Sequence, residues 1–321
     1  MTQKCPNTVL NMFREKHITK LTTGYITNIH LTMPYLEVTH ESLARVDIII
    51  HGLPTVFFDR TNNLSVWSIV ELFLTAEHPP QSVIFCSRPD LYQNGHMMAF
   101  VVQISCSLTP SVHLISKYQK PEIKLAMSTS LHHIGNTSYS MLTTMSNQDT
   151  KEKLGDFFIK FVLVDRGTRK SSPIPKSFLV QLKDRSLFDA NRPYQMPAIP
   201  EMPKSIFDIT VTPRHSDLDV NQHVTTHRYI QFFTDCATEA AQRGFYKHFN
   251  DDMCRYPVEK YDITLLGESK VGDTLRVCTW QDSKDMKNIY FSCLKASSCV
   301  MKAVFVYGTD KMAPKIPPHY M

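Results

Sequence analysis

Glycine is scarce in this sequence, which has only 10 glycines among 321 residues. Their spacing produces neither the GxGxxG pattern of dinucleotide-binding folds nor the GxSxG pattern of serine esterases, so both classes lose their usual sequence support. The eight cysteines are scattered without a CxxC pair, and no apolar signal segment precedes them. This distribution favours reduced, mostly buried thiols.

Net charge is also small, because 35 basic residues stand against 30 acidic ones and leave a formal charge of +5. Such a balance is too slight to predict nucleic-acid binding through phosphate neutralisation, although it suits a mildly anionic substrate. No uninterrupted apolar run nears the roughly 18 residues of a membrane helix, so we expect no membrane span. The apolar fraction of 42% is ample for hydrophobic cores, and the length predicts about two globular domains.

The segment before Glu37 contains one acidic residue, Glu15, and several basic ones. Mitochondrial presequences share this shortage of acids, but this segment has no serine and no arginine cluster. We therefore expect a cytoplasmic protein, with a mitochondrial location as the alternative. Residues 1–40 are assigned to an N-terminal extension.

A long internal repeat organises the rest of the chain. In each copy a strand-like run leads into a polar turn, and a helical pattern of apolar residues follows. The two copies align without a gap from Asp59 with Asp219 to Phe73 with Phe233. The first copy predicts a strand at 55–58, a turn at 59–63 and a helix with Val66, Ile69, Val70 and Phe73 in the core. The second predicts a strand at 206–211, a polar stretch at 213–222 and a helix from about His223 to Gly244, with Ile230, Phe233, Ala237 and Ala240 in the core.

Runs rich in β-branched and aromatic residues follow each helix and predict antiparallel strands. These runs are 97–108, 122–132, 138–146 and 156–164 in the first copy, and 261–266, 274–281, 289–296 and 299–307 in the second. A proline-rich connector at 171–205 separates the copies. We therefore predict an α+β fold with a first domain at 41–172, a linker at 173–205, a second domain at 206–310 and a tail at 311–321. In each domain a sheet wraps one long helix, and edge strands pair the two copies as a pseudo-dimer.

The polar turn before the second helix carries residues suited to catalysis. It places Asp217, Asp219, Asn221 and His223 at alternate positions, which face one way if the segment is extended. A calcium loop could take its first ligands from this turn, but it requires glycine and glutamate where the chain has Gln222 and Arg228. The calcium hypothesis therefore fails at two positions.

Two further chemical hypotheses and one structural alternative remain for this turn. Zinc is suggested by His223 and His227, one helical turn apart, with Asp219 as a third ligand, but Val224 replaces the general-base glutamate of the zinc-protease motif. Hydrolysis of an ester or thioester by activated water requires a base, polar groups to hold the water, and donors such as the N–H groups of a helix start. In the structural alternative, Asp217 or Asp219 caps the helix and His223 only packs.

The sequence of 217–224, DLDVNQHV, closely resembles the signature of the plant and bacterial acyl-ACP thioesterases, a family of double hotdog fold in the thioesterase superfamily. The likeness extends to 268–275, which aligns with the strand that bears this family's catalytic glutamate. It also extends to 164–175, which resembles the end of the family's first hotdog domain. The resemblance covers roughly residues 40 to 310 and is strongest at these motifs.

By this resemblance the catalytic residues are Asp219, Asn221, His223 and Glu268. Our mechanistic hypothesis is that Glu268 and Asn221 position the attacking water. His223, oriented by Asp219, then handles the proton and the polarised thioester. These roles could be exchanged between the residues.

The chain departs from the family pattern at two places. The family continues as HVNN, whereas this chain has Thr225 and Thr226, so hydroxyls replace amides at the helix start. Together with Val224 they are the substrate-binding residues that we predict in this turn. The family often has a cysteine after the glutamate, but this chain has Ser269, which argues against a thiolate nucleophile.

The first copy of the turn has Asp59, Thr61 and Asn63, so it keeps the carboxylate and loses the imidazole. We therefore expect the first domain to shape the acyl pocket and not to carry out hydrolysis. Trp67, on the adjoining helical pattern, is a predicted substrate-binding residue, with plain core packing as the alternative.

The sequence as a whole predicts an enzyme of fatty acid metabolism. It would hydrolyse fatty acyl thioesters of acyl carrier protein or CoA to free fatty acid and carrier thiol, with no cofactor and no metal. A homodimer of double hotdog chains is the assembly we consider. The alternatives are a non-catalytic acyl-binding or scaffold hotdog protein and a zinc-dependent hydrolase.

Overall fold

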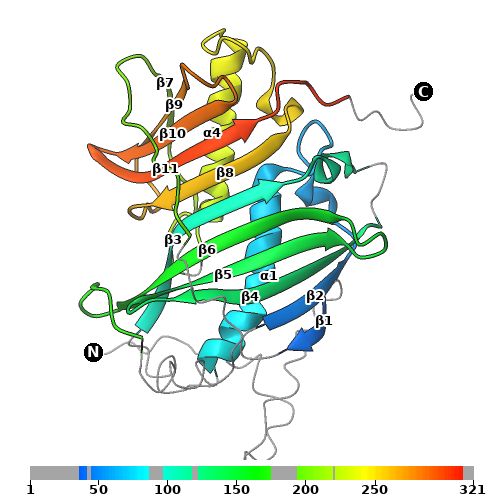
Figure 1. Cartoon of the computed structure of the whole chain (residues 1–321). Helices are drawn as coiled ribbons and strands as arrows, with labels where there is room; N and C mark the ends of the chain where they lie inside the picture. Colours follow the sequence, from blue (N-terminus) through cyan, green and yellow to red (C-terminus); the bar gives the residue numbers. More distant parts are fainter. Residues whose placement is uncertain are drawn as a thin grey trace, which may run out of the picture. The chain divides into compact units, whose positions relative to one another are not determined.

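The described residues build one antiparallel sheet of 11 strands, drawn in the computed structural model of Figure 1. The structure describes residues 36–41, 45–86, 97–117, 122–174, 194–219 and 221–313. They all belong to one unit, Thr32–Met321. The strand order is β1-β2-β4-β5-β6-β3-β8-β11-β10-β9-β7.

Each half of the chain contributes one side of this sheet. The first half, 36–174, supplies β1 (Leu36–Glu41), β2 (Arg45–His51), β3 (Met97–Leu108), β4 (Lys124–Ile134), β5 (Ser138–Asn147) and β6 (Lys153–Asp165). The second half, 194–313, supplies β7 (Phe207–Val211), β8 (Val258–Leu265), β9 (Leu275–Gln281), β10 (Asn288–Lys295) and β11 (Ser298–Tyr307). Every strand predicted after the two helices is present, with ends shifted by at most three residues.

Two long helices lie along the same face of the sheet (Figure 1). Helix α1 (Val66–Cys86) contacts β2, β4 and β5, helix α4 (Thr226–Gln242) contacts β7 and β9, and the two helices contact each other. The ring of Phe73 stacks on Phe157 at 4.6 Å, and that of Phe233 stacks on Phe291 at 4.9 Å. Burial of each such side chain stabilises the fold by about 1.5–3 kcal/mol, which fixes both helices on the sheet.

The apolar helix positions predicted for the core are largely confirmed. In α4, Ile230, Phe233, Ala237 and Ala240 are all fully buried. In α1, Ile69, Val70 and Phe73 are buried, whereas Val66 is only partly so. A helix with an apolar stripe at this spacing must cover that stripe, and the sheet provides the cover.

The halves meet where β3 pairs with β8, so the expected pairing of edge strands is confirmed. In this register Ser105 faces Asp262. The hydroxyl of Tyr194, from the segment before β7, is 2.6 Å from the Ser105 hydroxyl and 3.4 Å from a carboxylate oxygen of Asp262. The sheet is continuous across this seam, and its division into two domains at the predicted boundaries stays a prediction.

Local geometry differs from the sequence expectation at three places. The predicted strand at 55–58 is instead a 3-10 helix, η2 (Thr55–Phe57), in which the Phe57 N–H donates to the Pro54 carbonyl at 3.0 Å. Pro54 fixes φ at −54°, which suits a turn, and this overrides the strand preference of the following residues. Helix α4 begins at Thr226 and not near His223. Strands β1 and β2 were not predicted, and β1 starts inside the assigned N-terminal extension.

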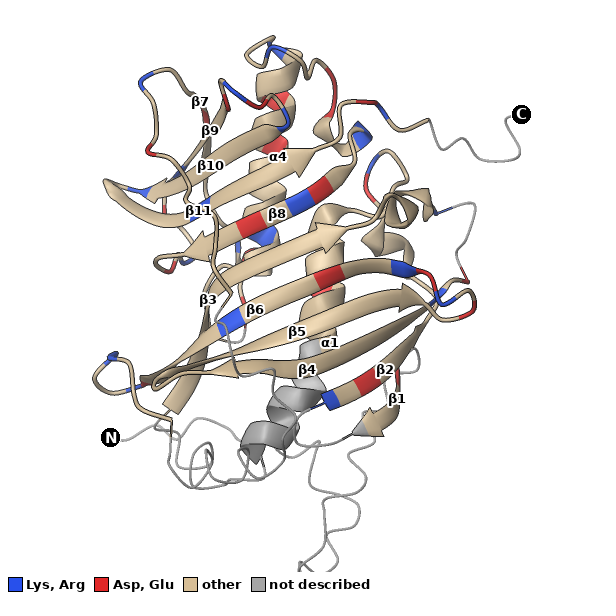
Figure 2. Cartoon of the chain, viewed as in Figure 1, with Lys and Arg blue, Asp and Glu red and all other residues tan. Residues whose placement is uncertain are grey.

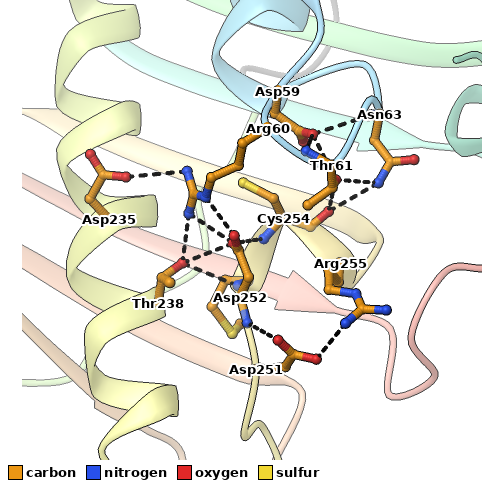
Figure 3. A network of polar contacts seen from close by, with 11 residues as sticks. Asp59, Arg60, Thr61, Asn63, Asp235, Thr238, Asp251, Asp252, Cys254 and Arg255 are labelled. Carbon is orange, nitrogen blue, oxygen red and sulfur yellow. Dashed lines mark hydrogen bonds and ion pairs between the residues drawn. The ribbon is translucent and has the colours of Figure 1, made fainter. Parts of the chain in front are cut away.

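A polar network also joins the halves, and Figure 3 shows it. The guanidinium of Arg60, in the first half, donates to both carboxylate oxygens of Asp252 in the second, with one contact at 2.8 Å. It also donates to the Thr238 hydroxyl at 3.2 Å and lies 3.6 Å from Asp235. Because Thr238 and Asp235 lie on α4, these two contacts tie the first-half turn to the second-half helix, and the bidentate contact ties it to Asp252 in the segment after that helix.

Lys and Arg residues alternate with Asp and Glu residues along the described chain, on loops and also within strands and helices (Figure 2). Pairs such as Lys260 with Asp262 at 2.9 Å and Arg276 with Asp208 at 2.9 Å illustrate this mixing. Within the described ranges, neither helix combines the length and the apolar character that crossing a membrane requires.

Candidate functional site

The polar turn before α4 is closed by the Asp219 carboxylate. Its Oδ1 accepts the backbone N–H groups of Asn221 at 2.8 Å and His223 at 3.1 Å, and the Asp219 N–H donates to the His223 carbonyl at 2.8 Å. Gln222, between them, has φ of +64°. An aspartate that binds the backbone two residues ahead favours such a turn over an extended strand. This turn keeps His223 outside the helix.

Asp217 does not join the other polar side chains, which corrects the expectation of four side chains facing one way. Asp217 is buried in a 3-10 helix, η4 (His215–Asp217), where its carboxylate accepts the Arg214 N–H at 2.8 Å. It also lies 3.4 Å from Nε of Arg228, and its carbonyl accepts the Thr225 N–H at 2.9 Å. Asp217 therefore holds the turn in place from the buried side.

His223 and Glu268 lie side by side. Nε2 of His223 is 3.2 Å from Oε2 of Glu268, and the two side chains are 15% and 27% exposed. Glu268 stands in the loop after β8, and the N–H of Val224 donates to the Ser269 carbonyl in that loop at 2.8 Å. The backbone contact fixes the loop beside the turn, so the imidazole and the carboxylate meet just beyond the C-terminal end of β8.

Asp219 reaches His223 through the backbone, which differs from the expected role of orienting the imidazole. The carboxylate next to the imidazole belongs to Glu268. Asn221 is exposed, and its amide nitrogen lies 3.5 Å from Oδ2 of Asp219. The turn therefore presents an amide, an imidazole and a carboxylate from neighbouring positions.

A further residue, Arg169, reaches this site from the first half. Its Nη2 donates to Oε2 of Glu268 at 2.6 Å, and its guanidinium lies 5.1 Å from the centre of the Phe100 ring. Arg169 belongs to the motif at 164–175 that marks the end of the first half. Sequence comparison gave it no role, because nothing in the sequence indicates that this turn faces Glu268.

A pocket of about 450 Å³ opens at these residues and is lined by both halves. The predicted site residues in its wall are Asp219, Asn221, His223, Val224, Thr225, Thr226 and Glu268. The first half adds the apolar strand segment 99–102, Val164 and Arg169. The volume lies within the range of about 300–1,000 Å³ found for small-molecule pockets. Seven of the eight predicted site residues thus share one pocket with a polar end and an apolar wall.

Trp67 is the predicted residue that this pocket does not include. It lines a separate cavity of about 20 Å³ beside Asp59 and Asn63, in the first-half turn. That turn has the same backbone design, because Asp59 Oδ1 accepts the N–H groups of Thr61 at 2.7 Å and Asn63 at 3.2 Å. The cavity has room for about one water molecule, so it cannot hold an acyl chain in this conformation.

Tyr229 is a pocket residue that sequence reasoning missed. It lies on the first turns of α4, is buried, and lines the wall beside Thr225 and Thr226. Burial raises the pKa of its hydroxyl well above the ordinary value, so this group stays neutral at physiological pH. The apolar spacing of this helix singled out Ile230 and Phe233 and indicated no role for Tyr229.

The two histidines considered for zinc face different partners. Nε2 of His223 faces Glu268, whereas Nε2 of His227 lies 3.4 Å from the Thr225 hydroxyl. Burial lowers the pKa of His227. In the described part of the chain, no three His, Cys, Asp or Glu residues are grouped in a way that could hold a metal ion.

Comparison with solved structures gives the same fold over most of the chain. The 12:0-ACP thioesterase from Umbellularia californica superposes with a TM-score of 0.66 at 14% identity, over 84% of this chain and 99% of that one. An acyl-ACP thioesterase from Bacteroides thetaiotaomicron superposes with a TM-score of 0.60 at 16% identity, over 82% and 98%. No protein-family model and no curated protein sequence matches the chain. The likeness establishes the fold that these structures share.

Proposed function

We propose that this protein hydrolyses fatty acyl thioesters to free fatty acid and carrier thiol. The observation that carries the proposal is the His223–Glu268 pair, 3.2 Å apart at the polar end of a pocket of about 450 Å³. An imidazole beside a carboxylate is suited to activating water, and an apolar wall is suited to an acyl chain. The similar solved structures are named as acyl-ACP thioesterases, and the DLDVNQHV signature supports the same activity.

The proposed reaction begins with a water molecule held by Glu268 and the Asn221 amide. Its oxygen attacks the thioester carbonyl carbon while Oε1 of Glu268 takes the proton, and the Nε2–H of His223 donates to Oε2 and holds that carboxylate in place. The carbonyl oxygen becomes an oxyanion, and the first-turn N–H groups of α4 suit it, because such groups have no intrahelical acceptor and carry the positive end of the helix dipole. Thr226, which lines the pocket, begins this turn. The intermediate then breaks the C–S bond, and the proton on Glu268 passes to the departing sulfur.

The proposed organisation has two tandem hotdog domains, at 41–172 and 206–310, joined by a linker at 173–205. The second carries His223 and Glu268, and the first contributes the apolar wall of the pocket. Residues 1–40 and 311–321 are the proposed extension and tail. The carrier is acyl carrier protein or CoA, both of which are anionic.

The proposal is tested by release of free thiol from a panel of medium- and long-chain acyl-CoAs and acyl carrier proteins. We expect turnover by the wild-type protein and its loss in His223→Ala at unchanged melting temperature. Tight acyl binding without thiol release would instead select a non-catalytic acyl-binding protein. Stoichiometric metal in the purified protein, together with inactivation by chelators, would select the zinc-dependent hydrolase.

A further inference from the structure

We propose that Arg169 of the first half is a positioning residue for Glu268 in the second half. The inference rests on the proposed function. The contact is a charge-assisted hydrogen bond of 2.6 Å from Arg169 Nη2 to Oε2, the same oxygen that lies 3.2 Å from His223. One carboxylate oxygen therefore receives both the guanidinium and the imidazole.

This arrangement restrains a side chain that would otherwise be mobile. Glu268 is 27% exposed and stands in a loop, so without a partner its three side-chain torsions would sample several rotamers. With Oε2 occupied, Oε1 has no hydrogen-bond partner among the described residues and is left for the attacking water. Arg169 acts through Glu268 and makes the second-half site depend on the first half.

The Arg169 side chain is itself held in place. The turn that carries it is closed by Asp165, whose Oδ1 accepts the Thr168 N–H at 2.7 Å and whose carbonyl accepts the Arg169 N–H at 2.9 Å. The guanidinium stands 5.1 Å from the Phe100 ring centre, a distance typical of a cation–π contact. The Phe100 ring thus supports the guanidinium of Arg169, which extends from the first half to Glu268.

The backbone of Arg169 has a conformation that favours glycine. Arg169 has φ of +58°, a left-handed conformation that glycine adopts without strain and arginine does not. A position chosen only for the turn would favour glycine. Arginine at this position therefore carries a conformational cost that glycine would not.

Glycine substitution separates the backbone role of residue 169 in the turn from the side-chain contact with Glu268. Arg169→Gly removes the guanidinium and relieves the strain, so we expect an equal or higher melting temperature together with a kcat about 10- to 100-fold lower, because a misplaced catalytic group costs on that order. KM should stay within about 3-fold, since Arg169 acts on the water and not on the acyl chain. Arg169→Lys should retain an intermediate kcat, because the lysine ammonium keeps the positive charge but lacks the planar guanidinium that fixes the direction of the hydrogen bond.

The matched control is Arg166→Gly, which removes one positive charge from an exposed position in the same turn. We expect it to leave kcat unchanged. Millimolar guanidinium ion should restore part of kcat in Arg169→Gly, and sodium chloride at equal ionic strength should not. A purely structural role for Arg169 predicts no such rescue.

The outcomes distinguish this inference from the proposed function. Wild-type turnover with an unaltered kcat in Arg169→Gly would overturn the positioning role and leave the proposed function intact. An equal loss of kcat in Arg166→Gly, or a failure of guanidinium to rescue, would also overturn it. Absence of thiol release by the wild-type protein from every substrate in the panel would overturn both.

Discussion

Removal of His223 and Glu268, singly and together, tests whether the two side chains act as a unit. Loss of a proton-transfer group lowers turnover by about 10²- to 10⁴-fold, so each alanine variant should lose about 10³-fold, or about 4 kcal/mol of transition-state stabilisation. Independent groups would make the double variant lose about 10⁶-fold, or about 8 kcal/mol.

The 3.2 Å separation of His223 Nε2 and Glu268 Oε2 predicts that the double variant loses less than this 10⁶-fold product. Groups in contact show interaction energies of up to about 3 kcal/mol, which leaves about 5 kcal/mol, or about 10⁴-fold, for His223→Ala/Glu268→Ala. The assay is single-turnover and steady-state thiol release at saturating substrate, with melting temperatures recorded for every variant. Losses that multiply to the full 10⁶-fold product, or either single variant with wild-type kcat, would refute the mechanism.

The first-half turn provides a matched control at the equivalent position. Asn63 Nδ2 donates to the Thr61 hydroxyl at 2.7 Å and to the Cys254 carbonyl at 3.3 Å, and the residue is buried. Asn63→Ala should therefore lower the free energy of unfolding by about 1–3 kcal/mol while kcat stays unchanged. A loss of kcat in this variant that matched His223→Ala would show that the assay reports stability and not chemistry.

Two further predictions follow from pKa shifts. Burial lowers the pKa of His227, against the opposing charge of Glu71 on α1, with Arg228 lowering it and Asp217 raising it. The imidazole of His227 therefore binds a proton more readily in the unfolded chain than in the folded protein. Stability from neutral His227 is complete above the unfolded pKa of about 6.5 and is lost as the pH falls below it. The melting temperature of His227→Gln should fall less than that of wild type between about pH 7 and pH 5, and parallel curves would contradict this. Burial raises the pKa of Cys278 to about 11, so about one molecule in 10³ holds the thiolate at pH 8. Peptide mapping after iodoacetamide treatment should show slow alkylation of native Cys278 and fast alkylation in denaturant, and equal rates would contradict the raised pKa.

Periodicity identified the parts of the fold in which the cause is local. The apolar spacing of Ile230, Phe233 and Ala237 predicted the buried face of α4, and runs rich in β-branched and aromatic residues predicted the later strands. Strand β2 was missed, although its burial alternates along Arg45–His51. The 3-10 helix at Thr55–Phe57 was missed because the composition favours a strand, while the preceding proline decides the backbone.

The sequence also placed the residues of the polar turn, because the DLDVNQHV signature lies within eight consecutive positions. Its internal geometry was harder to predict. The Asp219 carboxylate binds two backbone N–H groups and folds the segment into a turn, so alternation along the sequence did not become alternation in space. Asp217 is consequently turned into the interior.

The tertiary structure decided which distant groups meet. Arg169 and Glu268 are 99 residues apart in the chain and touch because β3 pairs with β8, which brings the end of β6 beside the loop after β8. Trp67 was assigned to the substrate pocket from its helix face, but it lines a different cavity. Local patterns fix what a segment becomes and which side it buries. The neighbours of that side depend on strand order, which no single segment encodes.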